Sequence, residues 1–263
     1  MAGTGAGYDL SVSTFSPDGR VFQVEYACKA VDSSGLCMAA QCKDGVLFLV
    51  EKPKPSPLLL PSSMRRIHAI TEYIGMAIVG LPADGRQLVK RAREEAAEYL
   101  RVFGVDIQPA VLAERIGLYM HAYSLYWSVR PFGAAVLIGA VATPEFQALS
   151  REIYCVDPSG CCSKYRATAL GKGRPSAKTE LEKLDLPATT TQEALVALLK
   201  ICMTVSDEER DRSSKVQMEA AFLSSATQGR FAMVPEQELA DAVKAARDAI
   251  DAQERDDDEE EEL

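Results

Sequence analysis

The sequence predicts an α+β fold built in layers. Two blocks of strand-like segments, at 36–80 and 132–170, are each followed by a pair of amphipathic helices. Such blocks, in place of strict alternation, favour layered α+β packing over a doubly wound sheet. Several strand segments are apolar on both faces, which indicates sheets covered on both sides. Helix pairs on opposite faces of two packed sheets would give four layers, although the pattern alone leaves a single covered sheet open.

The first block begins with a hairpin. The segments 36–42 and 46–50 are short and apolar, and Lys43-Asp44-Gly45 joins them with an Asp-Gly step that favours a tight turn. The segment 52–63 then contains four prolines, which exclude a helix interior or a central strand, so we expect an extended surface loop. The other elements expected in this half are two strands between 67 and 80 and helices over 84–103 and 109–126.

The second half repeats this order. We expect strands over 132–142, 147–157 and 162–170, helices over 176–184 and 191–208, short strands over 217–226 and 230–233, and a last helix over 235–252. Thr190 and Glu193 have the spacing of a capping box, which predicts a helix start at 191. No linker-like segment divides the chain, and we therefore expect one large domain.

Charge is concentrated at the C-terminus. Residues 256–262 carry seven acidic side chains, which account for most of the net charge of −9 over 263 residues. The body is nearly neutral and lacks the basic patch of a nucleic-acid-binding protein. No apolar run reaches the roughly 18 residues of a membrane span. We therefore expect neither nucleic acid nor a membrane as a partner, and the tail is open to two interpretations, solvation or interaction.

The seven cysteines lack metal-binding or redox spacing. There is no Cys-x-x-Cys pair, and most cysteines lie in apolar runs, which favours buried free thiols in a reducing compartment. Oxidation can join Cys161 and Cys162, although adjacent cysteines are usually only neighbours on a strand. His68 lies in an expected strand and His121 on an expected helix, and we interpret both as structural. The sequence therefore predicts no metal site and no cofactor.

Residues 8–31 combine a turn with a helix of unusual pattern. Ser16-Pro17-Asp18-Gly19 is a turn signal, because proline sets φ at its second position and glycine permits positive φ. The helix expected over 20–31 has two apolar stripes, one containing Val24 and the other Phe22, whereas a surface helix normally needs one. We therefore expect it to be buried against both its own domain and a neighbouring subunit.

The segment from Tyr8 to Ala27 is similar to the N-terminal signature of proteasome alpha subunits. The shared residues are Tyr8-Asp9, Phe15-Ser16-Pro17, Gly19-Arg20 and Gln23-Val24-Glu25-Tyr26-Ala27. Further agreement follows at Gly80-Leu81, Val129-Arg130-Pro131-Phe132-Gly133, Asp157-Pro158-Ser159-Gly160 and Ala177-Lys178-Thr179-Glu180. The resemblance covers about residues 5–235, and within the family it is strongest to the eukaryotic subunit at the seventh ring position.

This resemblance implies both the architecture and the domain limits. Proteasome alpha subunits have the four-layer αββα sandwich of N-terminal-nucleophile hydrolases, with an extra N-terminal helix. The implied division is a flexible gate arm over 1–15, the αββα domain over 16–252 and a disordered acidic tail over 253–263.

The resemblance also implies the function and the partners. Alpha subunits of this family are non-catalytic and form the outer seven-membered ring of the 20S core particle. The implied partners are six other alpha subunits, the beta ring, and the regulatory particle or other activators, in ubiquitin-dependent protein degradation in the cytoplasm and nucleus. Phe22 and Val24 would lie at the ring interface. Three adjacent leucines, Leu58-Leu59-Leu60, rarely remain in water, and at least one is expected to pack on a neighbour or an activator.

Five further positions match functional residues of the family. Tyr8, Asp9, Pro17 and Tyr26 match the cluster that holds the gate of the axial pore open. Arg66 stands where the family has a basic residue, commonly lysine, that captures the C-terminal carboxylate of an activator. An arginine would bind a carboxylate through two hydrogen bonds. An ordinary surface cation is an equally open interpretation of Arg66.

Catalysis by this chain is not expected. Proteasome beta subunits resemble the alpha type in fold, but they cleave peptides with an N-terminal threonine whose own amino group is the base. Alignment on the turn at 43–45 puts the nucleophile position near Gly35, which has no hydroxyl and lies inside the chain. The catalytic lysine position falls near Arg66, whose guanidinium keeps its proton. The alternatives are a self-sufficient hydrolase of this fold and a free-standing acidic adaptor.

Overall fold

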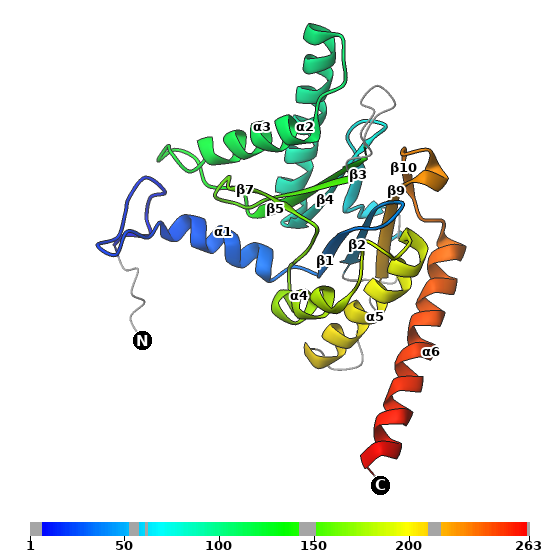
Figure 1. Ribbon diagram of the computed structural model, residues 1–263. Coiled ribbons are helices and arrows are strands. Elements are labelled where there is room, and N and C mark those ends of the chain that lie inside the picture. Colours follow the sequence, from blue (N-terminus) through cyan, green and yellow to red (C-terminus); the bar gives the residue numbers. More distant parts are fainter. Residues whose placement is uncertain (1–6, 53–57, 61–62, 142–150, 210–216, 262–263) are drawn as a thin grey trace.

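The computed structural model describes residues 7–52, 58–60, 63–141, 151–209 and 217–261 (Figure 1). Two antiparallel five-stranded sheets form its centre, in the orders β10-β9-β2-β1-β8 and β3-β4-β5-β6-β7. The strands of the first sheet are β1 (Cys37–Gln41), β2 (Gly45–Lys52), β8 (Ala167–Leu170), β9 (Gln217–Ser224) and β10 (Phe231–Met233). The strands of the second are β3 (Ile67–Ala69), β4 (Ile74–Gly80), β5 (Ala134–Val141), β6 (Arg151–Val156) and β7 (Cys162–Tyr165).

Six α-helices lie within the described residues. They are α1 (Phe22–Asp32), α2 (Pro82–Phe103), α3 (Pro109–Ala122), α4 (Arg174–Lys183), α5 (Thr191–Glu209) and α6 (Glu236–Glu261), and a short 3₁₀ helix, η2, spans Ser225–Thr227. Within these residues, none of the helices is both long and apolar enough to cross a membrane.

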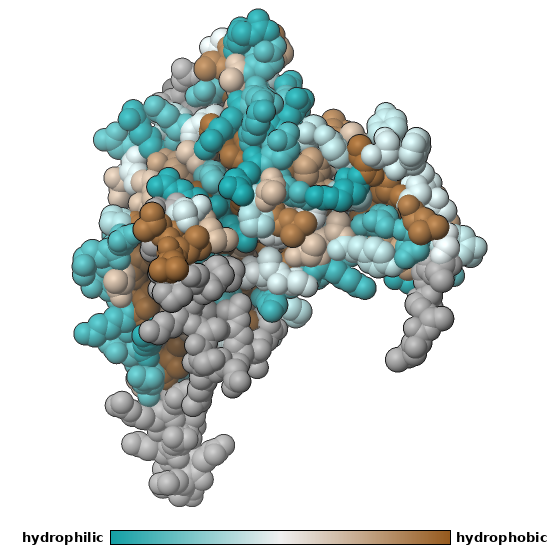
Figure 2. Space-filling view, turned by 180° about the vertical axis from the view of Figure 1, so that it is seen from behind, coloured by the Kyte–Doolittle hydropathy of each residue, from teal (hydrophilic) through white to brown (hydrophobic). Residues whose placement is uncertain are grey.

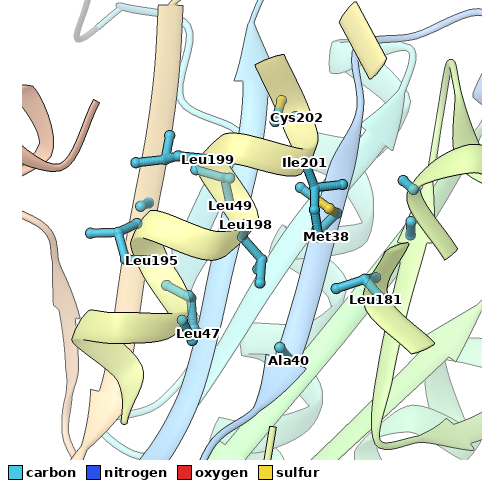
Figure 3. Close-up of a cluster of buried hydrophobic side chains, with 14 of the residues drawn as sticks. Met38, Ala40, Leu47, Leu49, Leu181, Leu195, Leu198, Leu199, Ile201 and Cys202 are labelled. Carbon is cyan, nitrogen blue, oxygen red and sulfur yellow. The ribbon is translucent and has the colours of Figure 1, made fainter. Parts of the chain in front are cut away.

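Three buried clusters define four layers. Helices α4, α5 and α6 cover the outer face of the first sheet, and α2 and α3 cover the outer face of the second (Figure 1). The third cluster, which includes Phe48 and Leu137, fills the space between the sheets. On the first outer face, leucines of α5, among them Leu195 and Leu198, pack in one cluster with Leu47 and Leu49 of β2 (Figure 3). The αββα sandwich expected from the sequence is confirmed.

Local sequence signals account for how the layers join. β2 and β5 are buried at every residue, as their apolar runs predict. The expected capping box is present, because the Thr190 backbone N–H donates to Glu193 at 2.9 Å and the Glu193 N–H donates to the Thr190 hydroxyl at 3.3 Å. Asp44 of the β1–β2 hairpin accepts a hydrogen bond from the Thr191 backbone at 2.7 Å. The hairpin turn and the start of α5 therefore fix each other.

The expected single strand over 162–170 is wrong. β7 pairs with β6 in the second sheet, whereas β8 pairs with β1 in the first. The chain therefore crosses from one sheet to the other at Arg166. Both halves are short and suited to extended backbone, so the residue pattern does not reveal the crossing.

Two helix ends also differ from expectation. α3 ends at Ala122, not near 126, because the Tyr123 and Ser124 N–H groups bond to Met120 and His121 in tight turns. α6 continues to Glu261, beyond the expected end at 252. No glycine or proline interrupts 236–261, and its alanine, glutamate, glutamine and arginine residues favour helix. The segment predicted to be a disordered tail over 253–263 is therefore helical up to Glu261.

Candidate functional site

The turn before α1 forms as its sequence predicts. The Gly19 N–H donates to the Ser16 carbonyl at 2.9 Å, and the Arg20 N–H donates to the Ser16 hydroxyl at 3.0 Å. Gly19 has φ = 73°, a value that an L side chain rarely adopts. Arg20 then pairs with Glu25 of α1. The turn therefore fixes the direction in which residues 7–15, here called the arm, leave α1.

The arm is attached to α1 at Asp9. The Tyr26 hydroxyl donates to the Asp9 carboxylate at 3.3 Å, and the Gln23 side-chain amide donates to the Asp9 carbonyl. Partial desolvation, and then the charge of Asp9, raises the pKa of Tyr26 above its ordinary 10.0. Val12 is 4% exposed and so anchors the arm a second time. We call the contacts of Asp9 with Gln23 and Tyr26 the latch.

Two of the four expected gate residues therefore meet. Asp9 and Tyr26 are in contact, whereas Tyr8 and Pro17 are exposed, and among the described contacts no hydrogen bond joins either of them to this pair. The gating role of the four residues stays a prediction. Sequence reasoning missed Gln23, although it lies three residues before Tyr26 and therefore shares a helix face with it.

Helix α1 contacts β4 and β5 with one of its faces. Phe22, Ala27 and Val31 are its buried residues. Phe22 is 5% exposed within this chain, so most of its ring packs on its own domain, and its place at the ring interface stays a prediction. Val24 is half-buried and Tyr26 is 40% exposed, and these two side chains remain available on the outer side.

The backbone packs closely around Gly35, which the alignment on the turn at 43–45 puts near the nucleophile position of catalytic subunits. A β-carbon built on Gly35 would lie 2.3 Å from the Glu51 carbonyl oxygen. A β-carbon on Gly171, whose φ is +94°, would lie 2.4 Å from the Gly35 carbonyl. Glu51 is buried, and its carboxylate accepts the Leu36 N–H at 3.1 Å. There is therefore no space at position 35 for any side chain without movement of β2.

Arg66 is buried at the neighbouring edge of the second sheet. Its guanidinium donates to the Gly80 carbonyl at 2.8 Å, it is 8% exposed, and burial lowers its pKa. The interpretation of Arg66 as an ordinary surface cation is therefore wrong, and its exposed neighbour is Arg65. Capture of an activator's carboxylate by Arg66 stays a prediction.

Glu219 of β9 links the two sheets beside Arg66. Its carboxylate accepts the Arg66 N–H at 3.1 Å and pairs with the Lys52 ammonium at 3.0 Å. The Glu219 and Lys52 side chains are 5% and 7% exposed. A buried ion pair compensates for its lost hydration only with good geometry and added hydrogen bonds, and this pair has both. We call Gly35, Glu51, Lys52, Arg66 and Glu219 the closed end.

Two packed antiparallel sheets between helix layers, preceded by α1, define a sandwich of the N-terminal-nucleophile hydrolase type. A family model described as proteasome subunit matches residues 31–223, and one described as the A-type N-terminal signature of proteasome subunits matches residues 8–30. The chain therefore belongs to the alpha subunits of the proteasome 20S core.

Several relatives match nearly the whole chain. Proteasome subunit alpha type-3 of Spinacia oleracea is 43% identical over 256 residues, which cover 97% of this chain and 100% of the relative. The alpha type-3 subunit of Acanthamoeba castellanii is 45% identical over 95% of this chain and 96% of its own. The probable alpha type-7 subunit of Saccharomyces cerevisiae is 39% identical over 95% of this chain and 86% of its own.

Proposed function

We propose that this alpha subunit is non-catalytic and acts by building the outer seven-membered ring and by contributing its arm to the gate of the axial pore. The single observation that carries the proposal is the latch. It holds the part of the arm before the buried Val12 to α1 through hydrogen bonds at one residue, Asp9, and leaves Tyr8 and Leu10 exposed. A segment held this weakly can exchange between two positions at small cost in free energy.

The closed end supports the non-catalytic part of the proposal. A threonine nucleophile must reach its substrate from an open cleft, with a base within hydrogen-bond distance. Position 35 instead packs against the Glu51 carbonyl, and the nearby Arg66 donates to Gly80. A guanidinium cannot serve as a proton acceptor at neutral pH. These contacts support a structural role for the closed end, which links the two sheets.

Exposed apolar side chains support assembly with other subunits. Leu58 and Leu60 are 93% and 71% exposed, and Leu10 and Phe15 of the arm are 87% and 69% exposed. Figure 2 shows that the brown side chains on the far face form separate patches among teal and white ones. We infer that the proposed partners, six other alpha subunits, the beta ring and activators such as the regulatory particle, cover some of these patches. Degradation of ubiquitin-tagged proteins in the cytoplasm and nucleus is the setting that we propose.

Deletion of residues 2–11 tests the gating proposal. The truncated chain keeps Val12 and the turn before α1, so the particle should assemble. Its peptide hydrolysis without activator should rise, because the particle then lacks the contribution of this arm to the proposed gate. Full assembly with an unchanged basal rate would show that this arm is not part of the seal.

A further inference from the structure

A cleft of about 490 Å³ lies between α3 and the turn that joins β6 to β7. Leu118 and His121 line it from the helix, and Cys161 and Cys162 line it from the turn. None of its lining residues belongs to the latch or the closed end, and the proposed function uses none of them.

Two glycines bring the walls of this cleft together. A β-carbon on Gly117 of α3 would lie 2.7 Å from the Gly160 carbonyl oxygen, and one on Gly160 would lie 2.4 Å from the Gly117 carbonyl oxygen. Gly160 also has φ = 86°. The helix and the turn therefore meet backbone to backbone, which only glycine permits at both positions.

Hydrogen bonds hold the turn in place. The Asp157 carboxylate accepts the Ser159 N–H at 2.9 Å and the Cys161 N–H at 3.2 Å. His121 Nδ1 lies 3.2 Å from the Ser159 carbonyl oxygen. The backbone that carries Cys161 is therefore fixed by bonds within the turn and by a contact from α3, next to the cleft that both cysteines line.

The seven cysteines differ sharply in accessibility. Cys37, Cys42, Cys155 and Cys202 are buried, Cys28 and Cys162 are half-buried, and Cys161 is exposed. Burial raises the pKa of Cys42 to about 12 and that of Cys155 to about 12, which leaves those thiols protonated and inert. Burial and then Glu114 also raise the pKa of Cys162. Cys161 and Cys162 are therefore the adjacent pair of accessible thiols. The raised pKa of Cys162 favours reactions in which its thiol is neutral.

We propose that Cys161 and Cys162 form a dithiol site for small apolar trivalent arsenicals. Consecutive α-carbons are about 3.8 Å apart, close enough for one arsenic atom to bridge both sulfurs. Both cysteines line the same cleft, Cys161 from the turn and Cys162 from the first residue of β7. The organic group of the arsenical would lie against Leu118.

The reaction is a condensation without change of oxidation state. The two S–H bonds and the As=O bond of an organoarsenic oxide break, two As–S bonds form, and the oxygen leaves with both protons as water. Arsenic stays trivalent, so neither an oxidant nor a reductant is needed.

Intact-mass spectrometry of the full chain with phenylarsine oxide tests the proposal. After reduction and removal of the reductant, one arsenical should bind per chain, resist excess 2-mercaptoethanol and leave with 2,3-dimercaptopropanol. Cys161→Ser and Cys162→Ser should each lose this resistance to the monothiol. Cys28→Ser, which changes another half-buried thiol, is the matched control and should retain it.

Two results would overturn the proposal. One is retention of the arsenical against monothiol by either single cysteine variant, and the other is its release from the unchanged chain by 2-mercaptoethanol. Thermal melting shows whether each variant is folded, and Cys162→Ala replaces Cys162→Ser if the serine disturbs packing. Leu118→Glu sharpens the result, because it should weaken retention of phenylarsine oxide more than that of methylarsine oxide.

Discussion

The closed end and the arm differ in how the chain holds them. At the closed end, charged side chains that are 8% exposed or less are bonded to backbone and to one another across two sheets. The arm is hydrogen-bonded to α1 at one residue, Asp9, and one of its side chains, Val12, is buried. Among the described residues, the closed end is thus held by several buried contacts, whereas the arm is held by few. This difference is what the proposed gating role of the arm requires.

Loss of Glu219 should have the largest effect. Glu219→Ala removes the shared acceptor of Lys52 and the Arg66 N–H from a buried site, and we expect the free energy of unfolding to fall by about 3–5 kcal/mol. Denaturant unfolding of the full chain measures this loss. Glu180→Ala breaks an exposed pair with Lys183 and should cost about 0–1 kcal/mol. Equal losses in the two variants would mean that the buried contacts of Glu219 contribute no more to the free energy of unfolding than an exposed ion pair does.

A side chain at position 35 should have the next largest effect. Gly35→Thr forces a β-carbon toward the Glu51 carbonyl, and we expect a loss of about 1–3 kcal/mol or more and no peptidase activity. The control is Ser33→Thr, which enlarges an exposed residue and should change stability by about 0.5 kcal/mol or less. If Gly35→Thr kept its stability and gained hydrolytic activity, this would contradict the conclusion that close packing leaves no space for a side chain at position 35.

Removal of Gln23 should loosen the arm without unfolding the sandwich. Gln23→Ala deletes one hydrogen bond, worth about 0.5–1.5 kcal/mol, so amide exchange of residues 7–11 should accelerate about two- to tenfold. Gln87→Ala on the exposed face of α2 is the matched control. If exchange in the arm does not respond to Gln23→Ala, this glutamine does not hold it.

The smallest effect concerns pH. The Tyr26 phenol must keep its proton to donate to Asp9, so this contact is present below its raised pKa and is lost as pH rises through it, above 10.0. Asp9→Asn removes a negative charge beside Tyr26 and should lower the pKa of Tyr26. NMR titration of labelled tyrosine rings measures the shift, with Tyr26→Phe identifying the signal. A Tyr26 pKa that Asp9→Asn leaves unchanged would show that the two groups do not meet.

Residue patterns predicted the layers well because burial imposes them. The apolar runs of β2 and β5, the stripe of α2 and the capping box at Thr190 are local signals, and each corresponds to an observed element. The sheet change at Arg166 was not predictable, because pairing partners far apart in the chain decide it. The end of α6 was missed because charge repulsion alone does not stop a helix that lacks glycine and proline.

The candidate site was predictable only in part. Asp9 and Tyr26 come from a recognisable signature, and the structure brings them together. The Phe22 interface stays a prediction, because periodicity shows that a stripe is buried but not by which partner. From the sequence, the interpretation of Arg66 as a surface cation stayed open. The groups that accept its hydrogen bonds, in Gly80 and Glu219, lie 14 and 153 positions away in the chain.

Native mass spectrometry of the complex isolated through this chain tests the proposed ring role most directly. The expected result is a particle that contains other alpha subunits and beta subunits, from which gentle dissociation releases this chain as a member of the outer ring. Recovery of the chain alone at 28.6 kDa, or in a complex without beta subunits, would contradict it.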